Sequence, residues 1–321
     1  MIQAVCEAFG LRGARERADA GIAGSPERSV WRTVVADADG ASWVVERLHP
    51  GQAARREAVG ALLAGLAARG LGVVAPYRAA PDGAFCLAHA GAAWQVSPFV
   101  AGEELPRPGY IWDAGRGEAV GGVLGALAAA ATGLGAGLAG GPALPGYVDG
   151  LMAVLAAREP GVHARCAAAC RCIAPLCEAW GELPHMLAHG DLHPLNLIWQ
   201  GGLPVALIDW EFAGPRPELY DAANCIGCVG VEDPAALAKG FVPAFVAALR
   251  DLGVLRPDNA QWLMPLVVGL RFAWLSEWLR RRDREMVALE LDYLDLLAER
   301  APALVRAWAG HVEGPGRTPA R

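Results

Sequence analysis

Hydrophobic positions in the first hundred residues follow two different periods. Residues 29–40 and 41–48 are rich in β-branched residues and tryptophan, and the turn Asp37–Gly40 between them predicts a β-hairpin. Residues 52–70 instead place apolar side chains at helical spacing and end on Gly70, which predicts a helix. The predicted order is therefore helix, strand, strand, helix, strand and strand, over residues 1–20, 29–40, 41–48, 52–70, 83–90 and 92–100.

From Pro106 onward the spacing of apolar residues becomes helical. Long segments of alanine, leucine and glycine run to about Trp180, and helices resume from Asp233. Between them, residues 187–212 predict short strands around a polar loop. This organisation predicts an α+β protein with a small antiparallel sheet and one main helix in residues 1–103, a larger helical lobe in 104–311, and a flexible tail in 312–321.

Composition restricts the class of protein. The 321 residues are 54% hydrophobic and 19% charged, which predicts a packed core and excludes a disordered chain. The net charge of -6 supplies no general attraction for nucleic acid or an anionic membrane, so neither is expected as a partner. The stretch Gly117–Gly141 is rich in alanine and glycine, which favours a buried, closely packed helix over a membrane span. No secretory signal pattern opens the chain, so a cytoplasmic location is expected.

Four of the eight cysteines lie in one predicted helix, at positions 166, 170, 172 and 177. Together with His163, three of these thiols fall on one helix face, which is compatible with a metal site. Small hydrophobic thiols also fill the inward face of many helices. The sequence leaves it open whether the Cys166–Cys177 cluster binds anything.

The polar loop and its flanking strands, HGDLHPLNLIWQGGLPVALIDWEFAG (residues 189–214), concentrate the chemistry of the chain. A Gly-Gly turn joins two short strands, and this hairpin is expected to bring Asp191, Asn196 and Asp209 together. Phosphoryl transfer needs a carboxylate to accept the proton of the attacking hydroxyl, and oxygen ligands for Mg²⁺ on the phosphates. We therefore expect Asp191 to be the proton acceptor and Asn196 and Asp209 to bind Mg²⁺, with ATP or GTP as the phosphoryl donor.

The string H-G-D-x-x-x-x-N followed by I-D-W-E resembles the aminoglycoside phosphotransferase and choline kinase superfamily, whose fold is related to that of protein kinases. The resemblance implies a two-lobed kinase-like fold and a phosphotransferase that acts on a hydroxyl of a small molecule. Amino alcohols, amino sugars, homoserine and aminoglycosides are the acceptor classes that it suggests. It also implies that Asp221, in the stretch LYDAAN, braces the catalytic loop from below, and a structural role is expected for His189 as well.

In this superfamily a glutamate of the first large helix, here Glu57, pairs with a lysine of the third strand. The N-terminal lobe has no lysine, and strand alternation places Arg47 on one face with Trp43 and Val45. Arginine also binds phosphate, often bidentately. Arg47 is therefore expected to hold the α- and β-phosphates and to pair with Glu57.

Two further segments are expected to contact the nucleotide. The turn AGSPERSVW lacks a glycine-rich signature, but Ser25 and Ser29 offer hydroxyl or backbone donors to the phosphates. The segment SPFVAG resembles the connection between the lobes in the superfamily, which implies that backbone groups near Ser97 and Phe99 bind the adenine edge.

The acceptor site is expected near the C-terminal helices. The string IDWEF resembles choline-kinase-like sequences and implies that Glu211 stands near the metal and a cationic acceptor. Trp274 and Trp278 share a helix face, and with Glu277 they would suit an ammonium group through cation–π attraction. An ordinary buried aromatic stripe is the alternative for these tryptophans.

Two other functions are compatible with the sequence. A pseudokinase that binds nucleotide without transferring phosphate is suggested by the missing lysine. A protein serine/threonine kinase is disfavoured, because the short connection between Glu211 and Asp221 leaves no room for a regulatory loop. The acceptor, the choice between ATP and GTP, and the oligomeric state are not predicted.

Overall fold

The structure is a computed structural model that describes residues 1–20, 29–135 and 137–310. It divides into two compact units. The sheet unit comprises Met1–Glu104, Ala130–Ala139 and Leu197–Ala213, and the helical unit comprises Leu105–Ala129, Gly140–Asn196 and Gly214–Arg321. The segments Ala130–Ala139 and Leu197–Ala213 were not expected in the sheet unit, because the sequence pattern predicted that residues 104–311 form the helical lobe. The predicted tail, 312–321, lies outside the described residues.

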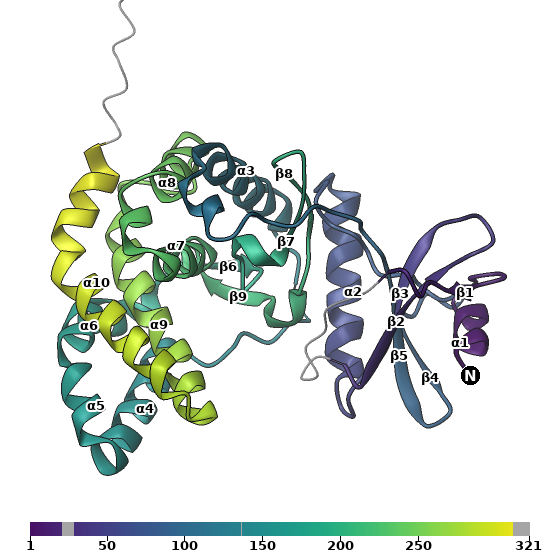
Figure 1. Ribbon diagram of the computed structural model, residues 1–321, viewed down its shortest axis with the longest axis horizontal. Helices are drawn as coiled ribbons and strands as arrows, with labels where there is room; N and C mark the ends of the chain where they lie inside the picture. The colour runs from purple at the N-terminus through teal and green to yellow at the C-terminus, as the bar shows by residue number, and fades with distance from the viewer. Residues whose placement is uncertain (21–28, 136, 311–321) are drawn as a thin grey trace, which may run out of the picture. The chain divides into compact units, whose positions relative to one another are not determined.

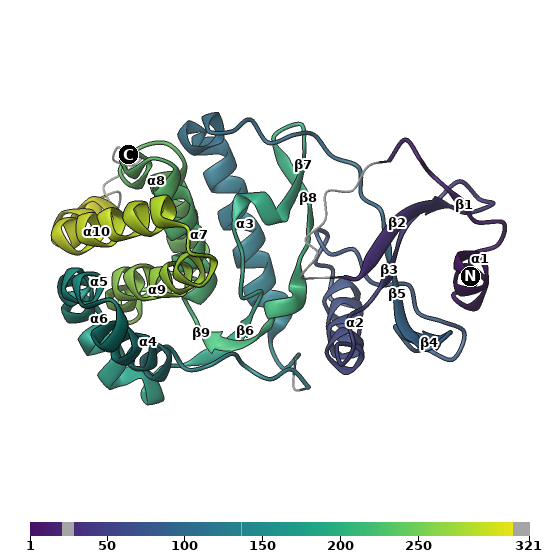
Figure 2. The same ribbon diagram turned by 60° about the horizontal axis from the view of Figure 1, so that its bottom comes forward.

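The sheet unit is built on a five-stranded antiparallel sheet in the order β1-β2-β3-β5-β4 (Figure 1). Helix α1 (Ile2–Ala8) lies on one face of this sheet and α2 (Ala53–Ala68) on the other (Figure 2). The predicted order of strands and helices is confirmed, except for the additional two-residue strand β1. The strands are β1 (Arg15–Glu16), β2 (Trp31–Ala36), β3 (Ser42–Arg47), β4 (Cys86–His89) and β5 (Ala92–Pro98).

The pairing register decides which side chains of β3 face which helix. Val45 lies opposite Val96 of β5, and both pack in a buried cluster with Val5 and Phe9 of the α1 region. Because successive side chains of a strand alternate between the two faces, the neighbouring Glu46 points to the α2 face.

A hairpin of β7 (Leu197–Gln200) and β8 (Leu203–Leu207) belongs to the sheet unit. The Glu103 amide donates to the Trp199 carbonyl at 2.7 Å, and the Leu207 amide donates to the Val73 carbonyl at 2.7 Å. A Cβ on Gly102 would lie 2.2 Å from a side-chain carbon of Ile198, so only glycine allows this close approach. These contacts join a segment late in the sequence to the sheet unit.

The helical unit packs its longest helices around a buried core. Helix α9 contacts both α7 and α10, and its Arg271 forms a buried bidentate ion pair with Glu290 of α10 at 2.6 Å. Two short strands, β6 (His185–Ala188) and β9 (Gly214–Pro217), pair beside them. The last two residues of α3 cluster with the sheet unit. The helices are α3 (Ala114–Ala131), α4 (Leu144–Arg158), α5 (Pro160–Arg165), α6 (Ala167–Ala179), α7 (Tyr220–Glu232), α8 (Phe241–Asp251), α9 (Leu263–Arg281) and α10 (Arg284–Gly310). Single 3₁₀ turns cover Gly109–Trp112, Trp180–Glu182, Pro194–Asn196, Pro234–Leu237 and Ala260–Trp262, and one more, Trp210–Phe212, belongs to the sheet unit.

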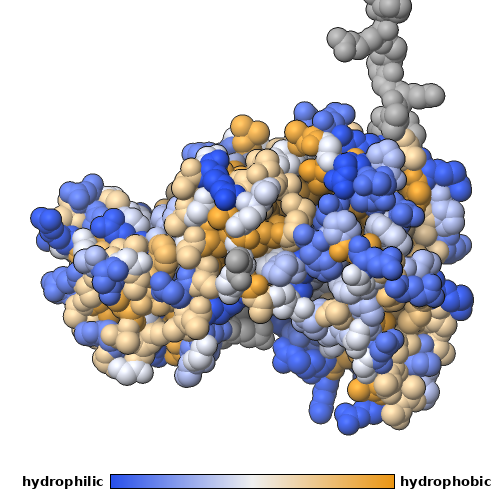
Figure 3. Space-filling view, turned by 180° about the vertical axis from the view of Figure 1, so that it is seen from behind, coloured by the Kyte–Doolittle hydropathy of each residue, from blue (hydrophilic) through white to orange (hydrophobic). Residues whose placement is uncertain are grey.

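Helix α3 explains most of the glycine-rich stretch that the sequence analysis assigned to a packed helix. Gly117, Gly121 and Gly125 follow one another by one turn, and added methyl groups would lie 2.2–2.7 Å from atoms of Phe241, Ala248 and Leu252. The glycines therefore let α3 approach α8 closely. Among the described residues, no helix has both the length and the apolar character needed to cross a bilayer. Figure 3 shows hydrophilic and apolar residues interspersed on the face that it presents.

Candidate active site

The candidate catalytic loop follows β6 in the helical unit and is braced from α7. The Asp221 carboxylate, 2% exposed, accepts the backbone N–H of His189 at 2.6 Å and of Gly190 at 2.8 Å. Gly190 has φ +85°, a conformation that glycine adopts without strain. The buried His189 uses Nδ1 to accept the Asp191 N–H at 3.2 Å. One carboxylate and one imidazole thus fix the backbone that carries Asp191.

Three side chains contact the Asp191 carboxylate within this unit. Asn196 Nδ2 donates to Oδ2 at 2.9 Å, Asn224 Nδ2 donates to Oδ1 at 3.4 Å, and His193 Nε2 lies 3.7 Å from Oδ2. Burial raises the pKa of Asp191, but the contacts with His193, the charge of His189 and the Asn196 hydrogen bond outweigh it, and the pKa lies below its usual value. Asp191 is therefore ionised at neutral pH.

Asn224 was missed by the sequence analysis. It lies three residues after Asp221 on α7, so the two side chains share one helix face. That spacing could have indicated it as a second contact of the loop.

Asn196 has a defined orientation. Its Nδ2 donates to both the backbone carbonyl and the carboxylate of Asp191, at 2.8 and 2.9 Å. The amide oxygen is therefore directed away from these two acceptors, and it is the atom of Asn196 with the chemistry of a metal ligand.

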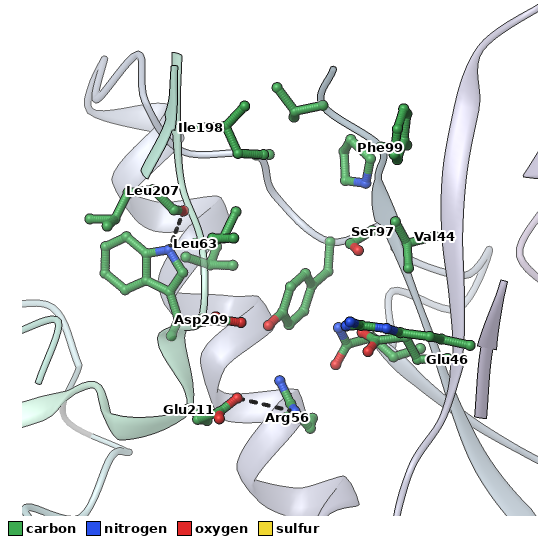
Figure 4. A pocket seen from close by; sticks show the side chains of 18 residues that line it. Val44, Glu46, Arg56, Leu63, Ser97, Phe99, Ile198, Leu207, Asp209 and Glu211 are labelled. Carbon is green, nitrogen blue, oxygen red and sulfur yellow. Dashed lines mark hydrogen bonds and ion pairs between the residues drawn. The ribbon is translucent and has the colours of Figure 1, made fainter. Parts of the chain in front are cut away.

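The sheet unit contains a cavity of about 190 Å³, and every described residue that lines it belongs to this unit. One end is apolar, with Val44, Phe99, Ile198 and Leu207 (Figure 4). The other end carries charged side chains, namely Arg32, Glu46, Arg56, Asp209 and Glu211. A cavity with one apolar and one charged end has the character needed for a base and its phosphates.

Asp209 lies at the charged end, two residues after the last residue of β8. Its backbone is left-handed, with φ 67° and ψ 49°, a conformation that is uncommon for a residue with a side chain. Such conformations persist where the surrounding structure holds them, frequently at functional sites. Glu211, two residues later, accepts from Arg56 Nη2 at 3.4 Å.

The assignment of Arg47 to the phosphates is wrong. The cavity is lined by Val44 and Glu46, whereas Arg47 lies opposite Trp94 on the face that packs toward α1. The strand alternation was predicted correctly, but the sequence carried no signal for which face α2 covers.

The predicted pairing of Glu57 with Arg47 is wrong as well. Both oxygens of Glu57 accept backbone N–H groups at the start of β4, from Phe85 at 2.9 and 3.0 Å and from Cys86 at 2.8 Å. Glu57 therefore anchors the β4–β5 hairpin to α2.

The remaining predicted nucleotide contacts are placed as follows. Ser97 and Phe99 line the cavity, but the Phe99 N–H donates to the Ser42 carbonyl at 2.9 Å within the sheet, so this amide is not available to a base. Ser29 is buried immediately before β2. Ser25 lies outside the described residues.

The predicted acceptor residues already contact cations of the protein itself. Trp274 and Trp278 stack at 5.8 Å, with Arg271 at 5.6 Å from the first ring and Arg281 at 5.6 Å from the second. The hydrogen bond from Arg280, together with that from Arg281, lowers the pKa of Glu277 to about 2 against the opposing effect of burial. These contacts do not favour an open ammonium site, and an acceptor role for these residues stays a prediction.

The cysteine cluster of α6 shows no metal-binding geometry. No group of three or more histidine, cysteine or acidic side chains suited to a metal ion occurs within the residues that the structure describes. Burial raises the pKa of Cys170, Cys172 and Cys177, and that of Cys166 to about 11, which keeps these thiols protonated at neutral pH.

Comparison with known proteins identifies the family. Residues 23–257, more than half of the chain, match the Phosphotransferase enzyme family, and the chain belongs to it. It is 31% identical to a homoserine kinase of Gluconacetobacter diazotrophicus over 189 residues, which is 56% of this chain and 58% of that protein. The curated relatives that it matches are each covered over less than two thirds of their length.

Solved structures share the fold at low identity. An aminoglycoside phosphotransferase from Alicyclobacillus acidocaldarius has a TM-score of 0.65 at 15% identity, over 92% of this chain and 98% of that chain. Amicoumacin kinase hAmiN, solved in complex with AMP-PNP, Ca²⁺ and Ami, has a TM-score of 0.62 at 15% identity, over 93% of each chain. The predicted kinase-like α+β fold and the resemblance to this superfamily are confirmed.

The pKa of Asp221 leads to a prediction about stability. Burial raises it to about 6, although the two amide hydrogen bonds oppose the shift. Between about pH 4 and 6 the native state binds this proton and the unfolded state has lost it, so stability falls as pH rises. The stability of the wild type relative to Asp221→Asn should therefore decrease by about 2 kcal/mol from pH 4.5 to 7.5. Urea denaturation at several pH values measures this difference in stability. A difference that does not change with pH would contradict a buried Asp221 carboxyl with a raised pKa.

Proposed function

We propose that this protein is an ATP- or GTP-dependent kinase that transfers the γ-phosphoryl group to a hydroxyl of a small molecule. The observation that carries the proposal is the ionised Asp191, held in place by Asn196, Asn224 and the braced loop. A fixed carboxylate of low pKa orients a hydroxyl and receives its proton as the oxygen attacks the γ-phosphorus. The bond from that phosphorus to the β-phosphate oxygen breaks, and the nucleoside diphosphate leaves.

Mg²⁺ fits the oxygen donors of this chain. Asp209 contributes a carboxylate and Asn196 an amide oxygen, which are hard ligands of the kind that Mg²⁺ shares with phosphates. The bound ion would neutralise charge on the nucleotide phosphates.

The apolar end of the cavity suits the nucleotide base. Backbone groups of successive residues in β5 point to opposite sides of the strand. The Phe99 N–H points toward β3, whereas the Val96 carbonyl, on the other side, accepts the backbone N–H of Arg78. We therefore assign the adenine edge to the Pro98 carbonyl and the Val100 amide, in place of the Phe99 amide.

The acceptor is proposed to be a small molecule that carries both a hydroxyl and an amino group, such as homoserine, an amino alcohol or an amino sugar. The homoserine kinase relative supports testing homoserine first. The purified protein with Mg²⁺ and ATP or GTP is assayed for ADP or GDP formation with homoserine, choline, ethanolamine, an amino sugar, an aminoglycoside and a generic protein. We expect one small hydroxyl compound to raise nucleoside diphosphate formation, and Asp191→Asn to abolish that increase.

A second candidate is a nucleotide-binding protein without transferase activity. It is favoured by Glu46, which lines the cavity from β3, the strand on which the superfamily carries its lysine. Nucleotide binding with no stimulation by any acceptor in the same assay would support this candidate.

A further inference from the structure

The cavity of the sheet unit has an unusual charge arrangement for a phosphate site. Two of its lining side chains are basic, Arg32 and Arg56, and three are acidic, Glu46, Asp209 and Glu211. The strand β3 contributes an acid, and the helix α2 contributes a base. This is the reverse of the strand lysine and helix glutamate expected from the superfamily resemblance.

Arg56 is held at the charged end by several groups of the same unit. The residue is 6% exposed, and its Nη2 lies 3.4 Å from Oε2 of Glu211 (Figure 4). Burial disfavours its charge, but a hydrogen bond to Tyr77 and the charges of Glu46 and Glu211 outweigh this effect and raise its pKa. Arg56 is thus a buried, permanently charged guanidinium at the end of the cavity where phosphates would lie.

Arg56 is better placed than Arg32 for this role. The sheet register sets Arg32 directly opposite Glu46 on the neighbouring strand, within reach of that carboxylate. Arg56 contacts Glu211, two residues from the proposed metal ligand Asp209. At 3.4 Å the contact between Arg56 and Glu211 is long, and it is weak enough to be exchanged for a phosphate oxygen.

We infer that Arg56 of α2 is the side chain that binds the nucleotide phosphates, and that Glu46 of β3 positions it in a charge-reversed helix–strand pair. The inference rests on the proposed nucleotide site, and it assigns to α2 the cation that the sequence analysis sought on β3. In the ligand-bound state the guanidinium donates to phosphate oxygens, while Glu46 and Tyr77 keep its orientation.

Binding of Mg²⁺–ATP and of adenosine by isothermal titration calorimetry tests the role of Arg56. Arg56→Ala should raise the Kd for Mg²⁺–ATP at least ~10-fold, since a charged hydrogen bond is worth roughly 1.5–3 kcal/mol, and leave adenosine within ~2-fold. The Kd of Arg56→Lys for Mg²⁺–ATP should lie between those of the wild type and Arg56→Ala, because lysine keeps the charge but lacks the paired N–H donors of the guanidinium. Arg47→Ala, a matched change on the opposite sheet face, should bind both ligands like the wild type. Unchanged Mg²⁺–ATP affinity in Arg56→Ala would overturn the inference.

A charge exchange tests the pairing with Glu46. Arg56→Glu alone should weaken Mg²⁺–ATP binding at least as much as Arg56→Ala. The double variant Glu46→Lys/Arg56→Glu restores one base and one acid to the same positions and should bind at least ~5-fold more tightly than Arg56→Glu, a coupling of about 1 kcal/mol. A double variant no better than Arg56→Glu would overturn the pairing. Thermal unfolding of each variant identifies any that fail to fold, and Arg56→Lys then decides the role of Arg56.

These binding measurements need no acceptor and therefore separate the inference from the proposed function. Arg56-dependent Mg²⁺–ATP binding without any acceptor-stimulated turnover would support the inference and contradict the kinase activity. Acceptor-stimulated turnover with normal Mg²⁺–ATP binding by Arg56→Ala would support the kinase activity and overturn the inference.

Discussion

Replacing Asp191 by asparagine is expected to lower kcat by at least ~100-fold, because a positioned general base contributes roughly 10²–10⁴ in rate. Asparagine has nearly the same size but cannot accept the proton of the acceptor hydroxyl. The Kd for nucleotide should stay within ~2-fold, because Asp191 belongs to the catalytic loop, and the base-binding cavity is lined by other residues. Steady-state kinetics and calorimetric nucleotide titration measure the two quantities.

Asn224→Ala is the matched control for this prediction. It removes the 3.4 Å hydrogen bond to Asp191 but leaves the carboxylate and its bond from Asn196. Because Asn224 only positions Asp191, Asn224→Ala should lower kcat less than Asp191→Asn does. The KM for nucleotide should change little. A normal kcat in Asp191→Asn would show that the general base is another group.

Asp209→Asn is expected to remove most of the Mg²⁺-dependent part of nucleotide affinity. The carboxylate carries a full charge to the ion, whereas an amide supplies only a dipole. Asparagine is preferred to alanine because the position has φ 67°, which asparagine tolerates and alanine does not without strain. The measurement compares the Kd for ATP with Mg²⁺ and with EDTA, in the wild type and in the variant.

Asn196→Ala provides the comparison for the metal site. It removes the amide oxygen assigned to the metal and should reduce the Mg²⁺ effect less than Asp209→Asn does. A full Mg²⁺ effect in Asp209→Asn would mean that the ion is held by other oxygens, of which Glu211 is the nearest candidate in the cavity lining.

Local patterns predicted the elements of the sheet unit and the residues of the catalytic loop. The Asp-Gly turn and the β-branched runs around it account for β2 and β3, and the helical spacing before Gly70 accounts for α2. Asp191 and Asn196 could be named because they lie five residues apart in one loop, where backbone geometry sets their spacing, whereas Asp221 was named from the family resemblance. Such features depend on neighbours in sequence, and a single sequence contains that information.

The choice of Arg56 as the proposed phosphate-binding cation depended on tertiary structure. Strand alternation separated Glu46 from Arg47 correctly, but both faces of β3 are covered, by α1 on one side and by α2 on the other. A period of two cannot show which covered face contains a cavity. The use of both Glu57 oxygens by the amides of Phe85 and Cys86 also had no signal in the sequence, since it joins residues 28 and 29 positions apart.

The sequence by itself therefore determined the order of elements in the sheet unit, the family and the residues that make up the loop around Asp191. Only the tertiary structure decided that the β7–β8 hairpin joins the sheet unit, that Phe99 donates to the sheet, and that Arg56 rather than Arg47 enters the cavity. The physical reason is that side-chain periodicity and loop spacing are local properties of the backbone. The face that becomes a binding site is chosen by packing between segments distant in the chain.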